Sequence, residues 1–279
     1  MSLSSKAMIV TLNVSCWTAR KQDKRVSAEV DANHNAKDAG RYNKLLIDKS
    51  HLDPLTSHAG AIRQYHYKMT LPWMDNGGRL LPSKLFFEYQ REMDRFKTSY
   101  TALVDTFLAT YDPVLIQQAR QRLGTLYDPE DYPPAHDLRS KFGVEIDIAN
   151  VPAASDFRVD VGDAERQRIQ AEMTEKLAKR QKDAMDSAWE RVRASVQLIH
   201  TRLSADKAIV HESLISNARE LMELLPGLNV ADDERMTVVA DHITRDLLVD
   251  IWTLRNSKKA RLEVAGKAAN ILKLIPSPS

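Results

Sequence analysis

The sequence predicts a mainly α-helical fold: a helical bundle with one long helix at about 163–203 and a small β element. Only 9 of the 279 residues are Gly and 11 are Pro, the two residue types that most often interrupt helices. Residues 163–203 contain neither and are rich in Ala, Glu, Lys and Arg. Strict alternation of apolar and polar residues, which is typical of strands, occurs in three short segments, at about 8–17, 144–148 and 157–161.

The first alternating segment predicts an N-terminal strand, because Val10, Leu12 and Val14 share one of its faces. Thr18 follows this segment, and a threonine is a favoured helix N-cap. We therefore expect a helix from Ala19 to about residue 30, with a basic exposed face.

Four further helices are expected before residue 143. In the segments 53–70, 82–108 and 112–124 a proline stands near the first helical position, where its missing N–H costs nothing. An Asn-Gly turn at 75–78 separates the first two of these helices, because glycine readily adopts positive φ. A short helix at 135–142 follows a proline-rich acidic loop.

The two later alternating segments leave the β pairing open. Either 144–148 and 157–161 pair with each other as a hairpin, or one of them pairs with the N-terminal strand.

The long helix at 163–203 is too long for a compact domain, since at 1.5 Å per residue it reaches about 60 Å. Its apolar residues recur at intervals of three and four. We therefore expect an antiparallel helical hairpin or a coiled coil, with the partner helix on this chain or on another copy. Two or three more helices follow, at 207–225, 232–255 and 260–274, with the break between the last two expected at 256–259. The change of pattern near residue 162 predicts two domains and a disordered tail, at 1–161, 162–275 and 276–279 respectively.

The charge excludes a protein that coats nucleic acid over its whole surface. The chain has 40 Lys and Arg against 38 Asp and Glu, a net charge of only +2. Residues 1–70 hold eleven basic side chains against six acidic ones, a local excess of +5. Any nucleic-acid site therefore has to be a local patch.

The sequence carries no motif for catalysis, for a metal or for a cofactor. It has no His-Glu-x-x-His, no cysteine pair, no calcium loop and no Gly-x-Ser-x-Gly turn. The glycine turn before Arg79 comes nearest to a phosphate-binding loop, but an ordinary turn beside an arginine explains it better. We expect no enzyme activity, no bound metal and no cofactor.

The single cysteine, Cys16, excludes an internal disulfide and is expected to be a small buried apolar side chain. No apolar run approaches the roughly 18 to 20 residues that span a bilayer. These features, with the lack of a signal peptide, predict a cytoplasmic protein that makes no membrane contact.

Basic and aromatic residues alternate in three clusters of the N-terminal quarter. Cations neutralise backbone phosphates, and exposed aromatic rings stack on unpaired bases. The structural alternative is that the aromatic rings are buried and the cations solvate a helix face. The nucleic-acid-binding candidates are Trp17, Arg20, Lys21, Lys24, Arg25, Arg41, Tyr42, Lys44, Arg63 and Lys68.

A resemblance to known proteins is carried by five stretches: 12–27, 38–46, 71–73, 131–133 and 156–163. Over about residues 8–225 the chain resembles a family of uncharacterised proteins encoded by tailed bacteriophages, prophages and integrative elements. No activity or catalytic residue is established for that family, so the resemblance implies no site residues. It implies a place in the cytoplasm of a bacterial host.

Two functions follow as expectations. The first is an oligomeric, non-catalytic DNA-binding or recombination-accessory protein that contacts single- or double-stranded DNA through the basic clusters. The alternative is a helical scaffold or adaptor that binds another protein, such as a phage ATPase or a host defence component, through the 163–203 helix.

Overall fold

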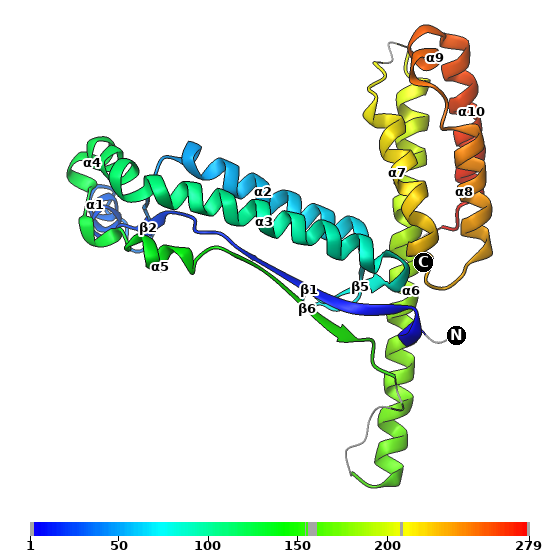
Figure 1. Cartoon of the computed structure of the whole chain (residues 1–279), viewed down its shortest axis with the longest axis horizontal. Helices are drawn as coiled ribbons and strands as arrows, with labels where there is room; N and C mark the ends of the chain where they lie inside the picture. Colours follow the sequence, from blue (N-terminus) through cyan, green and yellow to red (C-terminus); the bar gives the residue numbers. More distant parts are fainter. Residues whose placement is uncertain (1–2, 154, 156–160, 207–208, 278–279) are drawn as a thin grey trace. The chain divides into compact units, whose positions relative to one another are not determined.

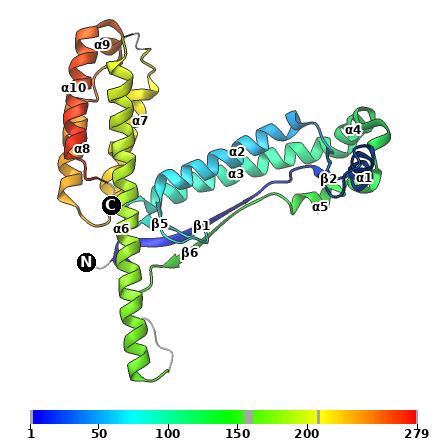
Figure 2. The same cartoon turned by 180° about the vertical axis from the view of Figure 1, so that it is seen from behind.

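The computed structural model describes residues 3–153, 155, 161–206 and 209–277. It is 68% helical with a small antiparallel sheet, which confirms the mainly α fold (Figures 1 and 2). The chain forms two compact units, each built from separated segments. Unit 1 comprises 1–11, 67–89 and 147–279, and unit 2 comprises 12–66 and 90–146. These units are interleaved along the chain, unlike the consecutive division expected at residue 161.

In unit 2 two long helices lie side by side, as both views show (Figures 1 and 2). His58 and Tyr65 of the first helix pack against Phe96 of the second, with ring centroids 5.5 and 5.6 Å apart. A two-stranded ribbon and short helices complete the unit. The elements that lie wholly or mainly in unit 2 are β2 (Arg20–Gln22), α1 (Lys24–Asn33), β3 (Asn43–Leu45), α2 (Lys49–Met69), α3 (Phe86–Thr110), a π-helical turn (Tyr111–Leu115), α4 (Ile116–Leu123) and α5 (Ala135–Arg139).

The helix expected from Ala19 begins five residues later. Ala19 has φ of 49°, outside the right-handed helical region, and Arg20–Gln22 pairs with β3 instead. The cap of α1 is Asp23, whose carboxylate accepts a hydrogen bond from the backbone N–H of Val26. The prediction of Thr18 as the cap was therefore wrong.

Helix α2 begins at Lys49, four residues before the predicted start. The Oδ1 atom of Asp48 accepts a 2.9 Å hydrogen bond from the backbone N–H of Ser50 and so satisfies one of the unpaired donors of the first turn. Pro54 therefore lies inside the helix and not at its first position. Helix α3 follows its predicted range closely, and α4 ends at Gly124 as expected.

The sheet has the strand order β4-β5-β1-β6. Strand β1 pairs antiparallel with β5, in a register that sets Ala7 opposite Pro82 and Val10 opposite Arg79. Since β6 lies beside β1, the strand expected at 144–148 pairs with the N-terminal strand. The segment 157–161 falls almost entirely outside the described residues. The strands are β1 (Ala7–Ser15), β4 (Leu71–Pro72), β5 (Arg79–Pro82) and β6 (Gly143–Asn150).

Unit 1 also contains a helical bundle built on α6, which spans Asp163–Ser204 and confirms the expected long helix. From Ala184 onward α6 buries one face, including Ala188, Val192 and Val196, against the following helices. These helices include the hairpin partner on this chain, α7. They are α7 (Ser213–Leu228), α8 (Glu234–Asp246), α9 (Ile251–Asn256) and α10 (Lys258–Leu274).

The predicted break near residues 256–259 is present, where the hydroxyl of Ser257 caps α10. The tail predicted to be disordered starts in contact with the bundle, because Arg193 donates hydrogen bonds to the carbonyls of Ile275 and Pro276. Over the described ranges, no helix combines the length and the apolar character that crossing a membrane requires.

Candidate functional site

Seven of the ten nucleic-acid candidates come together in unit 2, on the β2–β3 ribbon, the start of α1 and the residues that join them. The register of the ribbon sets Lys21 opposite Lys44. Together with the loop 125–131, this region encloses a groove of about 600 Å³, which we call the ionic groove. The seven candidates are Arg20, Lys21, Lys24, Arg25, Arg41, Tyr42 and Lys44.

Lys44 lies inside the protein and does not face solvent. Its side chain is only 7% exposed, with Nζ 2.5 Å from Oδ2 of Asp131 and 3.5 Å from Oδ2 of Asp23. The same ammonium donates a 2.9 Å hydrogen bond to the carbonyl of Leu126. Asp131 also pairs with Lys21 through Oδ1, at 3.3 Å. With its charge already paired, Lys44 acts as the centre of a buried ionic network.

The network shifts the titration of both partners. A backbone hydrogen bond from Val26 and the nearby charge of Lys44 lower the pKa of the Asp23 carboxyl below its usual range, against an opposing effect of burial. For Lys44, burial alone would lower the pKa, but the carboxylates of Asp131 and Asp23 outweigh it and raise the pKa above its ordinary value. Both effects hold the pair in its charged form at neutral pH.

The ionic groove is not a uniformly cationic surface. Four basic side chains line it, Lys21, Lys24, Arg25 and Lys44, against four acidic ones, Asp23, Asp128, Glu130 and Asp131. A polyanion entering the groove would meet both signs of charge.

Four cations in or beside the groove remain exposed, and the described part of the chain places no carboxylate within ion-pair distance of them. They are Arg20, Lys24, Arg25 and Arg41. Arg25 does donate a 3.3 Å hydrogen bond to the carbonyl of Thr125. Tyr42 is 40% exposed, so its ring is accessible to a stacking base.

The three remaining nucleic-acid candidates are not part of the ionic groove. They are Trp17, Arg63 and Lys68. The ring of Trp17 packs against Phe107 and Tyr111, with centroids 6.4 and 5.8 Å apart, so it is a packing residue. Arg63 donates a 2.7 Å hydrogen bond to the carbonyl of Val14. Lys68 belongs to unit 1 and pairs with Glu220.

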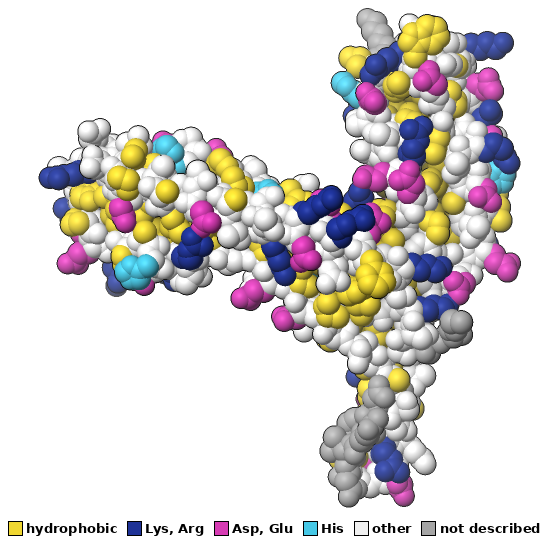
Figure 3. Space-filling view, in the orientation of Figure 1, with side chains coloured by type: hydrophobic (Ala, Val, Ile, Leu, Met, Phe, Trp, Pro, Cys, Tyr) yellow, Lys and Arg dark blue, Asp and Glu magenta, His cyan; other side chains and the backbone are white. Residues whose placement is uncertain are grey.

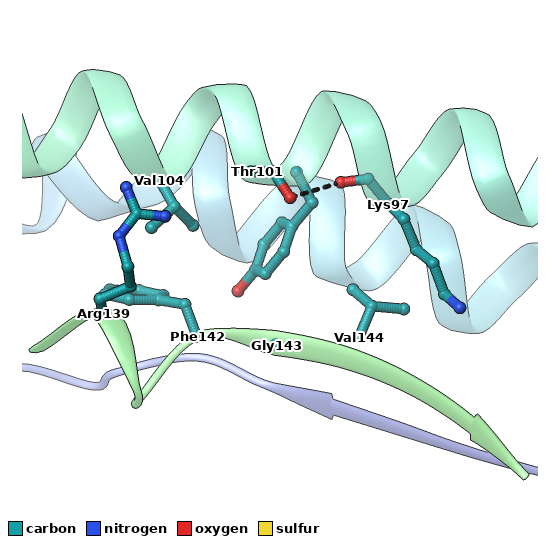
Figure 4. A pocket seen from close by; sticks show the side chains of 8 residues that line it. Lys97, Thr101, Val104, Arg139, Phe142, Gly143 and Val144 are labelled. Carbon is teal, nitrogen blue, oxygen red and sulfur yellow. Dashed lines mark hydrogen bonds between the residues drawn. The ribbon is translucent and has the colours of Figure 1, made fainter.

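A second cavity of unit 2, of about 220 Å³, lies between α3 and the segment 139–144 (Figure 4). Lys97 and Arg139 stand at its two ends, and Phe142 and Val104 line it between them (Figure 4). Arg139 is paired with Asp105, and the hydroxyl of Thr101 donates to the carbonyl of Lys97. The cavity has only two cationic side chains, and Arg139 is already paired with a carboxylate. The lining therefore does not indicate a particular class of ligand.

Two reactive side-chain types in unit 2, the phenol of Tyr100 and the thiol of Cys16, are held in their neutral forms. Tyr100, which lines this second cavity, donates a 2.8 Å hydrogen bond to the carbonyl of Ser15, and burial raises its pKa. Burial likewise raises the pKa of the Cys16 thiol, so this thiol has little of the thiolate character that a nucleophile needs. Within the described ranges, no three His, Cys, Asp or Glu side chains are grouped as a metal would require.

The first half of α6, residues 163–183, is the other predicted contact surface. None of its side chains is buried, whereas the second half supplies the core of the bundle. In Figure 1 this half extends beyond α7, α8 and α10. Ile169, Met173 and Leu177 are half-buried and lie on one side of the helix.

The sequence identified the cations of the ionic groove but not their carboxylate partners. Asp131 belongs to the acidic loop before residue 135, yet it neutralises Lys44 from 87 residues away in sequence. In the short strand Asn43–Leu45 the lysine is the buried residue and its two neighbours are exposed, an arrangement that the residue types alone do not indicate.

Comparisons of the chain with protein-family models, with curated proteins and with solved structures found no match.

Proposed function

We propose that this protein is a non-enzymatic helical scaffold whose copies associate through the first half of α6. The observation that carries the proposal is the apolar stripe of Ile169, Met173 and Leu177. These residues are spaced four apart, and after an interruption at Gln181 they lead into the stripe that is buried from Ala184 onward. In the described structure, however, no side chain of 163–183 is buried. A half-covered stripe on a projecting helix is suited to a second helix.

The charges along this half of α6 favour a second copy in antiparallel orientation. Residues 163–175 carry four acids and two bases, a charge of −2, and residues 176–183 carry four bases and one acid, a charge of +3. In an antiparallel pair with twofold symmetry, the negative segment of each copy faces the positive segment of the other. A parallel pair would bring like charges together. Ion pairs within the helix, such as Arg168 with Glu165 and Glu172, leave this overall asymmetry in place.

Sedimentation equilibrium of the full chain over a range of concentrations tests the proposal. We expect a dimer that the double variant Ile169→Glu, Leu177→Glu converts to a monomer, because it buries charge in the stripe. The matched control is Ala164→Glu, Ala171→Glu, which adds the same charge at exposed positions on the opposite side of the helix. Circular dichroism checks that both variants keep their helices. A wild-type chain that stays monomeric, or equal effects of both double variants, would overturn the proposal.

A second candidate function is a contact with nucleic acid, favoured by the exposed cluster of Arg20, Lys24, Arg25 and Arg41. Fluorescence anisotropy with single- and double-stranded DNA at about 50 and about 200 mM salt measures it. If three phosphate contacts are lost in Arg20→Ala, Lys24→Ala, Arg41→Ala, the slope of log affinity against log salt falls by about three.

The matched control for this triple variant removes three exposed cations elsewhere in unit 2: Lys49→Ala, Arg91→Ala, Lys141→Ala. An unchanged slope in the first variant, or no DNA binding at low salt, would exclude the contact. A phage ATPase or a host defence protein as a bound partner rests on the resemblance to phage-encoded proteins alone.

On the face of the helical bundle seen in Figure 3, acidic and basic side chains are interspersed. This pattern is typical of a solvated surface, and it gives this face of the bundle no broad cationic region for DNA.

A further inference from the structure

Two arginines of unit 1 converge on one backbone carbonyl. Arg79 of β5 donates hydrogen bonds to Thr70, from Nε to Oγ1 at 2.7 Å and from Nη2 to the carbonyl oxygen at 3.1 Å. Arg191 of α6 donates from Nη2 to the same carbonyl at 2.5 Å. It also donates to the carbonyls of Tyr67 and Lys68, each at 2.9 Å. Two like-charged guanidinium groups therefore meet at Thr70, whose own side chain is fully buried.

In the part of the chain that the structure describes, no carboxylate balances these two charges. Both arginines are half-buried, and among the described residues no Asp or Glu lies within ion-pair distance of either. Burial lowers the pKa of Arg79, and burial together with the charge of Arg79 lowers the pKa of Arg191 to about 10. Partly buried charges are normally paired, so this arrangement calls for a compensating group.

The carbonyls at the end of α2 compensate only part of the charge. The C-terminus of a helix is equivalent to about half a negative charge, against two positive charges here. Donor groups also remain unused. The Nη1 group of Arg79 and the Nε–H of Arg191 make no hydrogen bond within the described structure. The two arginines therefore cap the end of α2 and still have N–H groups that donate to no acceptor in the described structure.

We propose that Arg79 and Arg191 form a binding site for a phosphate group, either the free ion or a phosphate ester. The unused Nη1 group of Arg79 and Nε–H of Arg191 can donate to phosphate oxygens, and the two positive charges balance a dianion. Thr70 fixes Arg79 through Nε, and the ring of Tyr67 lies 4.8 Å from its guanidinium carbon. These contacts hold the guanidinium in place before the phosphate binds. The site is separate from the stripe on the first half of α6 and goes beyond the scaffold function.

Titration of the full chain with inorganic phosphate, followed by thermal unfolding, tests the site, with sodium chloride at matched ionic strength as the reference. We expect phosphate to raise the melting temperature in a saturable manner that chloride does not reproduce. In Arg79→Gln, whose amide can still donate to Thr70, we expect the affinity for phosphate to fall at least about tenfold. The matched control is Arg219→Gln, which removes an exposed arginine of α7 and should leave the phosphate response unchanged.

A second probe and a second variant keep the test decisive. Adenosine 5′-monophosphate in place of the inorganic ion distinguishes a phosphate ester from free phosphate, and Arg79-dependent binding of either supports the site. If Arg79→Gln does not fold, Arg79→Lys keeps the charge but loses the guanidinium, and weaker phosphate binding is again expected. Equal effects of phosphate and chloride on the wild-type chain, or an unchanged phosphate affinity in the folded Arg79 variant, would overturn the proposal.

Discussion

The ammonium of Lys44 lies 2.5 Å from Oδ2 of Asp131, and both side chains are less than a tenth exposed. The contact joins the β2–β3 ribbon to the loop 125–131, which are distant in sequence. Asp23, the cap of α1, completes the group at 3.5 Å. One buried lysine thus ties together a strand, a helix start and a loop of unit 2, and its main role is structural.

Lys44→Met is therefore expected to destabilise unit 2 by about 3 kcal/mol, because it leaves Asp131 and Asp23 buried without a positive partner. Urea unfolding followed by tryptophan fluorescence measures this. The control is Lys21→Ala, which removes the more exposed partner of Asp131, 54% exposed, and should cost less than about 1 kcal/mol. Similar losses in the two variants would contradict a central role for Lys44.

The same network makes stability depend on pH. The pKa of Asp23 is lower in the folded protein than its ordinary value, so its contribution is complete above about pH 4 and is lost as the pH falls through the folded pKa. The pKa of Lys44 is raised, so its contribution is complete below about pH 10 and is lost as the pH rises through the folded pKa. The urea concentration at the midpoint of unfolding should therefore stay constant between about pH 4 and about pH 10.

Asp23→Asn provides the check on the acid limb. Asparagine is also a good helix cap, so α1 is kept while the titrating carboxyl is removed. The variant should be less stable at neutral pH and should lose less stability than the wild-type chain on acidification. An acid limb identical to that of the wild type would show that Asp23 does not contribute to it.

In unit 1, Gly227 of α7 packs directly against Leu85. A Cβ atom built at Gly227 lies 2.6 Å from the side-chain carbons of Leu85. Gly227→Ala should therefore destabilise the protein by about 1–3 kcal/mol through overpacking. Gly266→Ala is the matched control in α10, where a Cβ meets nothing within 4 Å. There the substitution should stabilise by about 0.5–1 kcal/mol, because alanine favours the helix. Urea unfolding of both variants should give opposite signs.

Trp17 and Tyr42, both candidates for base stacking, should behave differently. Trp17 packs on Phe107 and Tyr111, so Trp17→Ala is expected to cost about 3 kcal/mol. Tyr42 is 40% exposed, and Tyr42→Ala should cost less than about 1 kcal/mol. Chemical unfolding measures both. A large loss for Tyr42 and a small one for Trp17 would contradict the packing described for them.

Periodicity predicted the long helices well, because α3 and α6 have long runs of apolar residues at helical intervals and few interruptions. Helix starts were less predictable. Asp23 and Asp48 cap helices for which the sequence pattern predicts a cap at Thr18 and a start at residue 53, since several nearby residues can cap and tertiary pairing decides among them.

The candidate site was predictable only in part. The sequence showed the excess of basic residues near the N-terminus, but the acid that neutralises Lys44 comes from a loop far along the chain. The meeting of Arg79 and Arg191 also depends on contacts between distant segments. Such pairings follow from the tertiary fold, which local patterns do not encode.

The most direct test of the scaffold proposal is disulfide cross-linking at the centre of the stripe. In an antiparallel pair centred on residues 163–183, Met173 of one copy meets Met173 of the other, close enough for a disulfide. With Cys16 replaced by serine, Met173→Cys should form a covalent dimer on mild oxidation, whereas Ala171→Cys on the opposite side should not. Equal cross-linking at the two positions, or none at residue 173, would contradict assembly through the first half of α6.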